Sequence, residues 1–227
     1  MVSYLILRLS GPMQFWGQPT FEGMRPTANF PTRSGLLGLL GACLGIRRND
    51  KTALQALSDS VRFAVRCDEH KLDDDSVKNK SVKVSKITDY HTIKDARVDY
   101  VSLKSHDIIQ TWREYLCDAH FTVAVWCLPD SHYKLASLVT AVQKPWFTPY
   151  LGRRSCPLSH PLYLGQCEAD NSRLALNQFG DGGTIYSEEA IDSKGYPLRV
   201  RDEPIVALPR QFSAHDWFVV QGDSSCS

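Results

Sequence analysis

The 227-residue sequence contains no long apolar run. A membrane-spanning helix needs about 20 mostly apolar residues, whereas the longest apolar-leaning stretch, Leu36–Ile46, is shorter and includes three glycines. Residues 1–10 lack a basic start and a small-residue cleavage site, so their alternation predicts a strand and not a signal peptide. Hydrophobic residues make up 43% of the chain, which excludes a disordered protein. We expect a cytoplasmic protein that makes no contact with a membrane.

Motifs for metal binding and for common catalytic sites are also missing. The seven cysteines show no CxxC spacing, and the seven histidines form neither HxH nor HExxH. A zinc site typically needs closely spaced ligand pairs, so we expect buried reduced thiols, no metal and no cofactor. The glycine motifs GxxxxGK[ST] and GxGxxG, which bind phosphates, are absent. The GxSxG turn of serine hydrolases is absent as well.

The net charge of +1 conceals an uneven distribution. Residues 1–154 hold 21 of the 26 basic and 15 of the 25 acidic residues, a balance of +6. Residues 155–227 hold the other 5 and 10, a balance of −5. A basic body suits a polyanionic partner, and an acidic end suits a basic protein neighbour. Uneven scatter of solvated charge explains the count equally well.

The hydrophobic pattern predicts an α+β fold. Strands are expected at residues 4–9, 61–67, 111–115, 121–126 and 161–167, with a closing strand near Trp217, and the alternation at 61–67 predicts a half-exposed strand. Helices are expected at 34–46, 50–60 and 130–142, the last two capped by Asp50 and Asp130. The order βα(α)β, insertion, βαβ is that of a ferredoxin-like (RRM-like) split βαβ domain. We therefore predict such a domain at 1–167 with a thumb hairpin inserted at about 68–112, and a β-rich C-terminal extension at 168–227 packed on it.

A glycine- and proline-rich segment, Gly11–Arg33, joins the first strand to the first helix. Its amides, aromatic rings and guanidinium groups are the mixture that binds single-stranded nucleic acid. Free N–H groups at a helix N-terminus also favour a phosphate. An ordered loop whose rings cover the core is the other interpretation. The candidate binding residues of this segment are Gln14, Trp16, Gln18, Arg25, Arg33 and Ser34.

The first helix carries a stripe of glycines at positions 35, 38, 41 and 45. Each glycine lowers helix propensity by up to about 1 kcal/mol, so the stripe predicts close approach of another backbone. We expect a strand or RNA to lie against Gly38 and Gly41. Alanine at either position should then reduce stability or assembly.

Two later segments are basic and aromatic. The insertion between Lys78 and Arg113 holds eight basic residues and four Asp, and residues 144–154 hold three basic residues, three aromatic residues and no acid. A solvated hairpin whose lysines prevent edge pairing is the alternative for the insertion. The histidines of the insertion could also serve a metal-independent endoribonuclease as general acid and base, which is the alternative function. The candidate binding residues are Lys83, Tyr90, His91, Lys104, His106 and Arg113 in the insertion, and Tyr150, Arg153 and Arg154 in the later segment.

Long blocks of the sequence resemble the CasD family, the subunit of the type I-E CRISPR Cascade complex that holds the 5′ handle of the guide crRNA. The blocks are residues 11–23, 30–46, 103–119, 150–158 and 208–212.

The resemblance implies a non-catalytic RNA-binding subunit of a complex that serves antiviral defence or guides another machine such as a transposon. It would cap the 5′ handle of the crRNA, anchor the Cascade backbone subunit and large subunit, and meet target DNA only indirectly. The usual RRM signature string is absent, so RNA contacts are expected from loops, thumb and helix start. We expect the acidic C-terminal third to face a protein neighbour.

Overall fold

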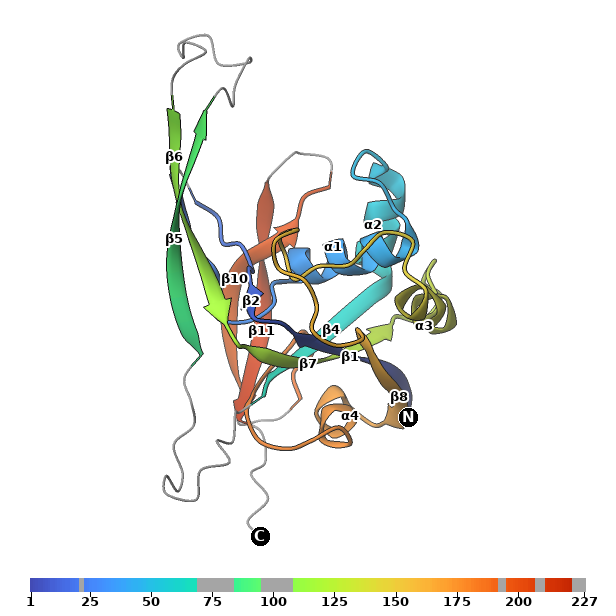
Figure 1. Cartoon of the computed structure of the whole chain (residues 1–227). Coiled ribbons are helices and arrows are strands. Elements are labelled where there is room, and N and C mark those ends of the chain that lie inside the picture. Colours follow the sequence, from blue (N-terminus) through green and yellow to red (C-terminus); the bar gives the residue numbers. More distant parts are fainter. Residues whose placement is uncertain (21–22, 69–83, 95–107, 192–194, 207–210, 222–227) are drawn as a thin grey trace, which may run out of the picture.

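An antiparallel sheet of seven strands forms the centre of the protein body (Figure 1). The computed structural model describes residues 1–20, 23–68, 84–94, 108–191, 195–206 and 211–221. The strand order in the sheet is β10-β11-β9-β4-β7-β1-β8. The strands are β1 (Val2–Ser10), β4 (Val61–Cys67), β7 (His120–Cys127), β8 (Tyr163–Ala169), β9 (Thr184–Ser187), β10 (Tyr196–Pro204) and β11 (Phe212–Gln221).

Helices cover both faces of this sheet (Figure 1). One face packs against α1 (Arg33–Leu44), α2 (Lys51–Ser60) and α3 (Leu135–Gln143), and the other against α4 (Ser172–Asn177). Alternate residues of β1 point to the two sides: Leu5, Leu7 and Leu9 join the core under α1, whereas Tyr4 and Ile6 join the core with α4. No helix among the described residues is long and apolar enough to cross a membrane.

The helix boundaries follow local signals in two of three cases. The α1 helix forms despite its glycines because its leucines at positions 36, 37, 39 and 40 are buried, and it ends at the left-handed Gly45 (φ +77°). The Asp50 cap is confirmed, since its side chain accepts a hydrogen bond from the Ala53 N–H at 3.0 Å. The predicted Asp130 cap is wrong: α3 begins at Leu135, and Asp130 lies in a turn with a φ of +55°.

The prediction that residues 61–67 form a half-exposed strand is also wrong. Strand β4 lies between β7 and β9, and α4 covers the face that the pattern left open. Its basic residue Arg66 is buried, and its guanidinium donates to Asp68 at 2.6 Å and to the Phe179 carbonyl at 3.0 Å. The alternating pattern was misleading because Arg66, which looks like a solvent-facing residue in the sequence, forms its ion pair and hydrogen bonds inside the protein.

A second sheet forms the thumb, which extends beyond the body of the protein (Figure 1). Strands β5 (Ser85–Lys94) and β6 (Ile108–Cys117) pair along their full length. The other edge of β6 pairs with β2 (Met13–Gln14) and β3 (Met24–Arg25), so the predicted N-terminal loop is partly strand and is joined to the thumb. The predicted binding residues Lys83, Lys104 and His106 lie outside the described residues.

Candidate nucleic-acid interface

A groove runs along the exposed side of α1. Two adjoining hollows of about 500 and 670 Å³ share six lining residues and together form this feature, which we call the α1 groove. Its first half lies between α1, the α1–α2 turn and the segment 147–152, and its second half between α1, the N-terminal segment and the β10–β11 hairpin. The shared lining residues are Ser34, Gly35, Gly38, Arg48, Leu54 and Gly152.

The floor of the groove is exposed helix backbone. Gly38 faces open space, because a Cβ built there would have no atom within 4 Å. Gly41 has only ordinary contacts, with side-chain atoms of Leu54 and Leu57 at 3.8 Å. No strand packs closely against either glycine in the described structure, so that part of the stripe prediction is wrong. Of the four glycines, Gly38 is the one that leaves helix backbone exposed, because Gly41 is buried and Gly35 and Gly45 lie against the rings of Trp16 and Trp146.

Positive charge surrounds this floor. Arg47 and Arg48 of the α1–α2 turn and Arg201 of β10 line the groove, and all three are exposed. None of the described lining residues is acidic. Within the described part of the chain, these arginines make no ion pair with a carboxylate. Aromatic rings complete the walls: Phe15, Phe147, Tyr150 and Phe212.

Three predicted binding residues line the groove or lie next to it, and three others are buried. Gln18, Ser34 and Tyr150 line the groove. The side chains of Gln14 and Trp16, however, are at most 1% exposed. The Trp16 indole N–H donates to Gln14 Oε1 at 3.0 Å, and Gln14 Nε2 donates to the Ala119 carbonyl at 2.6 Å. These two residues hold the N-terminal segment in the core, so their expected contact with RNA is corrected.

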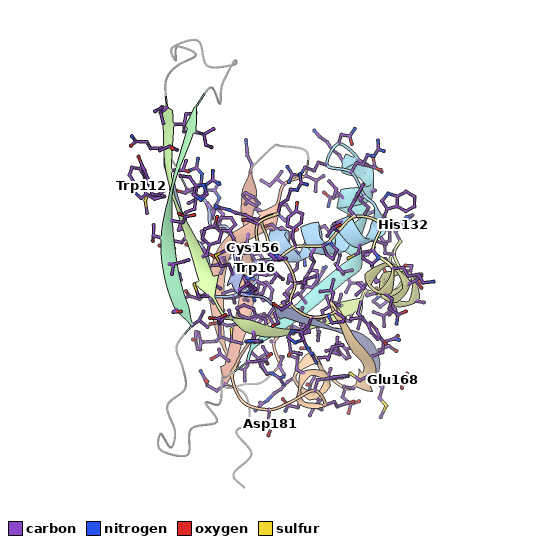
Figure 2. The ribbon with its side chains drawn as sticks, viewed as in Figure 1. Trp16, Trp112, His132, Cys156, Glu168 and Asp181 are labelled. Atoms are coloured by element: carbon purple, nitrogen blue, oxygen red, sulfur yellow. The ribbon has the colours of Figure 1, made fainter. Side chains whose placement is uncertain are left out.

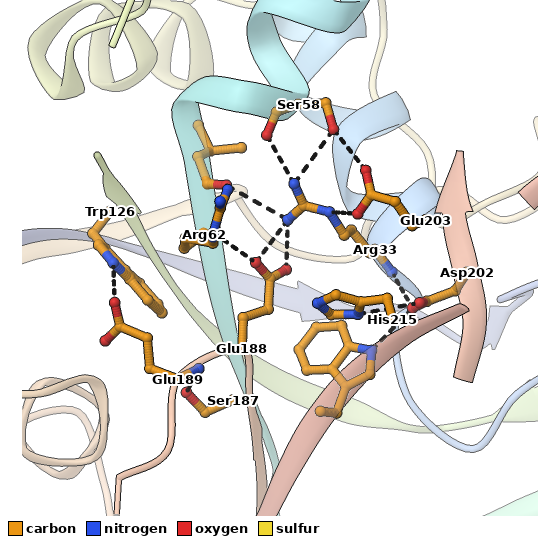
Figure 3. Close-up of polar contacts among 12 residues, drawn as sticks. Arg33, Ser58, Arg62, Trp126, Ser187, Glu188, Glu189, Asp202, Glu203 and His215 are labelled. Atoms are coloured by element: carbon orange, nitrogen blue, oxygen red, sulfur yellow. Dashed lines mark hydrogen bonds and ion pairs between the residues drawn. The ribbon is translucent and has the colours of Figure 1, made fainter. Parts of the chain in front are cut away.

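Arg33 is the third buried residue, and it lies in an internal ion cluster (Figure 3). Its guanidinium donates to both carboxylate oxygens of Glu188, at 2.6 and 2.7 Å, and also pairs with Glu203. Burial raises the pKa of Glu188 to about 7, while the attraction of Arg33 opposes the rise. Arg33 is shared by two carboxylates, which limits the stabilisation that it gives to either one. It therefore fixes α1 to the C-terminal strands and is not available to a phosphate.

The N-terminus of α1 is occupied in the same way. The Arg33 backbone N–H donates to Asp202 Oδ2 at 2.9 Å, and the Trp217 indole donates to the same oxygen at 3.0 Å (Figure 3). A carboxylate of the chain thus takes the position expected for a phosphate. Glu188, Asp202 and Glu203 belong to the acidic C-terminal third, so part of its charge is internal and does not form a surface for a partner.

Three of the four remaining predicted arginines gather beside the base of the thumb. Arg25 of β3 and Arg113 of β6 are register partners on neighbouring strands. Arg113 lies on the same face of β6 as Tyr115, whose hydroxyl accepts a hydrogen bond from Arg153 at 2.9 Å. The structure therefore brings Arg25, Arg113 and Arg153 to one side of the thumb, the side that faces the body.

The segment that carries Arg153 is firmly attached. The Arg153 guanidinium lies over the Phe15 ring, 3.6 Å from its centroid. The preceding Gly152 has a φ of +87°, and a Cβ there would lie 1.7 Å from the Phe15 carbonyl oxygen. Only glycine fits this position. Arg154, predicted as its partner in binding, is exposed but does not line the groove.

The opposite face of the thumb carries an apolar row. Tyr90 of β5, Trp112 of β6 and Met24 of β3 are register neighbours and are 51%, 40% and 46% exposed. The two rings are 5.5 Å apart, and Figure 2 shows Trp112 pointing away from the body. We call these three residues the outer row. Tyr90 is therefore separated from His91, which lies on the body-facing side.

His91 is held by a neighbour on its own strand. Its Nε2 lies 2.5 Å from an Asp89 carboxylate oxygen. Among the described residues, no group of three His, Cys, Asp or Glu side chains is arranged to hold a metal ion. The six described cysteines are free of disulfides, and burial raises the pKa of Cys67 to about 12, as expected for an unreactive thiol.

Sequence reasoning missed the groove's own arginines. Arg47 and Arg48 form an adjacent basic pair directly after the glycine-rich helix, a signal that could have identified them. Arg201 reaches the groove only because β10 folds back over α1, where its Nε–H donates to the Phe212 carbonyl at 2.7 Å. No local pattern marks that position.

The geometry of the groove and thumb can be compared with known proteins. Residues 4–214 match the family described as CRISPR-associated protein (Cas_Cas5). The chain belongs to the Cas5 family. It is also 60% identical to the CRISPR system Cascade subunit CasD of Escherichia coli strain K12, over 100% of both chains. The resemblance to the CasD family seen in the sequence is confirmed.

Solved structures agree with this family. A chain of a CRISPR RNA-guided surveillance complex has a TM-score of 0.71 and 27% identity, with 96% of this chain and 90% of that chain covered. A crystal structure of a Cas protein has a TM-score of 0.60 at 27% identity and covers 96% and 93%. The large antiparallel sheet with few helices is common to these Cas5-like structures.

Proposed function

We propose that this protein is an RNA-binding structural subunit of a type I-E Cascade complex, and that it caps and holds the 5′ handle of the crRNA in the α1 groove. The observation that carries the proposal is the groove itself, with its open glycine floor, three arginines and four aromatic rings. A backbone floor allows a sugar–phosphate chain to approach closely, cations attract the phosphates, and rings stack on bases. The CasD relative and the surveillance-complex chain support the same function.

We extend the RNA path to the body-facing side of the thumb. Arg153 adjoins the groove wall, and Arg113 and Arg25 continue the positive charge outward. His91 lies on this side as well, where its Nε2 is next to an Asp89 carboxylate oxygen. A strand leaving the groove would meet these residues in turn.

The architecture supports a ferredoxin-like core for this function. Strands β4, β7, β1 and β8 are adjacent in that order, and each is antiparallel to its neighbours. This is the order that a split βαβ unit produces. We propose that residues 1–167 form the RNA-binding domain with its thumb, and that the extension at 168–227 lengthens the same sheet beside β4 through β9.

We assign the contact with neighbouring Cascade subunits, the backbone subunit and the large subunit, to the outer row. Aromatic residues and methionine are enriched in protein interfaces, and charged residues are depleted from interface centres. The outer row has that composition, whereas the other thumb face carries Arg25 and Arg113. Target DNA would be met only through the assembled complex, which we expect to lie in the cytoplasm.

The test uses purified protein and labelled CRISPR repeat RNA in EDTA. We expect binding without cleavage. Gly38→Glu places a carboxylate on the groove floor and should weaken binding by about tenfold, the effect of removing roughly one favourable charge contact. Ala136→Glu, on the exposed side of α3, adds the same charge elsewhere and should leave binding unchanged. Equal affinity of both variants and wild type would refute the groove as the RNA site.

Site-specific cleavage in the same assay would support the endoribonuclease alternative instead. That activity should then disappear in His91→Ala or His106→Ala. Cleavage that both variants retain would point to a contaminating nuclease and would leave the binding result as the deciding measurement.

A further inference from the structure

Trp146 is the most exposed tryptophan of the chain, with 77% of its surface accessible to solvent. The structure describes all five tryptophans. Trp16, Trp126 and Trp217 are at most 3% exposed, and Trp112 of the outer row is 40% exposed. An exposed indole does not gain the hydrophobic free energy of burial in the folded chain, and exposed aromatic surface often marks a binding site.

The segment that carries Trp146 is attached to the end of α1. The Trp146 backbone N–H donates to the Cys43 carbonyl at 3.0 Å, and the Phe147 N–H donates to the Ala42 carbonyl at 3.1 Å. The ring lies against Gly45, where a Cβ would be 2.8 Å from the indole Cγ. The backbone that carries Trp146 is therefore anchored to α1, and the near edge of the ring rests on Gly45.

Trp146 stands beside one end of the α1 groove. Ile46 and Arg47, which follow Gly45, line the groove, and so do Phe147 and Thr148, which follow Trp146. A strand that passes over the glycine floor and leaves at this end meets the indole next.

The positive charge around Trp146 indicates an anionic ligand. Residues 143–156 and 42–49 contain no Asp or Glu, whereas Lys144, Arg47 and Arg48 are exposed beside them. Lysine is depleted from protein interfaces, whereas arginine and tryptophan are enriched there, so a protein ligand would also need acidic groups to match three cations. A flat ring among cations is instead the usual platform for an unpaired base of single-stranded nucleic acid.

We propose that Trp146 stacks on one unpaired nucleobase of the RNA where the strand leaves the α1 groove. This inference rests on the proposed function, because it requires RNA in the groove. It adds a stacking site outside the groove, since Trp146 is not one of the residues that line it.

The experiment uses the full chain with Trp112→Phe, which leaves Trp146 as the only exposed indole. Unstructured oligoadenylate and repeat-derived handle RNA are the two probes. Each should quench the indole emission and protect it from acrylamide. In the wild-type chain, Trp146→Ala should weaken binding by about 5- to 150-fold, the effect of losing one base stack. Trp146→Phe should restore most of the affinity, and both variants should melt like wild type because the side chain is exposed.

The outcomes separate this inference from the proposed function. If the chain binds RNA but Trp146→Ala binds equally well and the emission does not change, the stacking site is refuted and the function stands. If Trp146→Ala impairs assembly with Cascade subunits but not RNA binding, a protein occupies the site and the inference is wrong. If the wild-type chain and the assembled complex leave RNA unbound, both proposals fail.

Discussion

Gly38→Ala gives the sharpest test of the local geometry of α1. Alanine raises helix propensity over glycine by about 1 kcal/mol in an exposed helix interior. The new methyl group has no atom within 4 Å to collide with, so this gain is not offset. For a chain of this size, 1 kcal/mol corresponds to a rise in Tm of about 2–4 °C. The same methyl group narrows the groove floor, so RNA affinity should fall while stability rises.

The matched control is the same substitution one turn earlier in the helix. Gly35→Ala has the same helix propensity gain, but its Cβ would lie 2.7 Å from the buried Trp16 ring. We expect its Tm to fall. Thermal unfolding followed by circular dichroism measures both. A fall in Tm for Gly38→Ala, or a rise for Gly35→Ala, would refute the packing described here.

Four further predictions concern other parts of the account. Arg48→Ala should reduce the slope of log affinity against log salt by about 0.7, the contribution of one phosphate contact in single strands. Gly152→Ala should destabilise the chain by about 1–3 kcal/mol from its left-handed φ alone, and the clash with a neighbouring carbonyl adds to this loss. The pKa of Glu188 is about 7 in the folded chain and about 4.5 in the unfolded chain, so the folded chain binds an extra proton between these pH values and its free energy of unfolding falls as pH rises from 4.5 to 7. Glu188→Gln should remove this fall, which is roughly 3 kcal/mol at most. Trp112→Ala should weaken Cascade assembly by about 2 kcal/mol, as for an interface hot spot, with the RNA affinity of the isolated chain unchanged.

The first three of these changes each have a matched control. Arg8→Ala removes an exposed arginine away from the groove and should lower the salt slope less than Arg48→Ala. Ser155→Ala changes an exposed residue of the Gly152 segment without a φ penalty. Glu168→Gln makes the same carboxylate-to-amide change at an exposed position and is the reference for Glu188→Gln. Unfolding by denaturant at several pH values measures the last pair.

The order of elements was predictable because it depends on local periodicity. The strands at 4–9, 121–126 and 161–167 and the Asp50 cap match β1, β7, β8 and the start of α2. The Asp130 cap failed because a helix start also needs the following residues to turn at once, and here the chain passes through a left-handed turn first.

The role of Arg33 was not predictable from composition. Its carboxylate partners Glu188 and Asp202 lie 155 and 169 residues further along the chain. A basic, acid-poor segment looks the same whether its arginine faces solvent or a distant carboxylate. Burying such a charge requires partners of this kind, and only the fold supplies them.

The glycine stripe was read correctly as a surface but wrongly as a packing contact. Spacing of three and four residues identifies which glycines share a face of the helix. It does not say what lies opposite that face. The structure leaves Gly38 open, with Arg48 and Arg201 lining the same groove, whereas Gly35 and Gly45 at either side of it pack against the rings of Trp16 and Trp146.

The most direct test of the central claim is a cross-linking map of the assembled ribonucleoprotein. Photoreactive thiouridine is placed at each position of the 5′ handle, and the cross-linked peptides are identified by mass spectrometry. We predict adducts within residues 15–19, 32–48, 147–152, 201–206 and 211–212, the described segments that contribute lining residues to the α1 groove. Adducts confined to the outer row, or to the α4 face of the sheet, would show that the RNA does not lie in the groove.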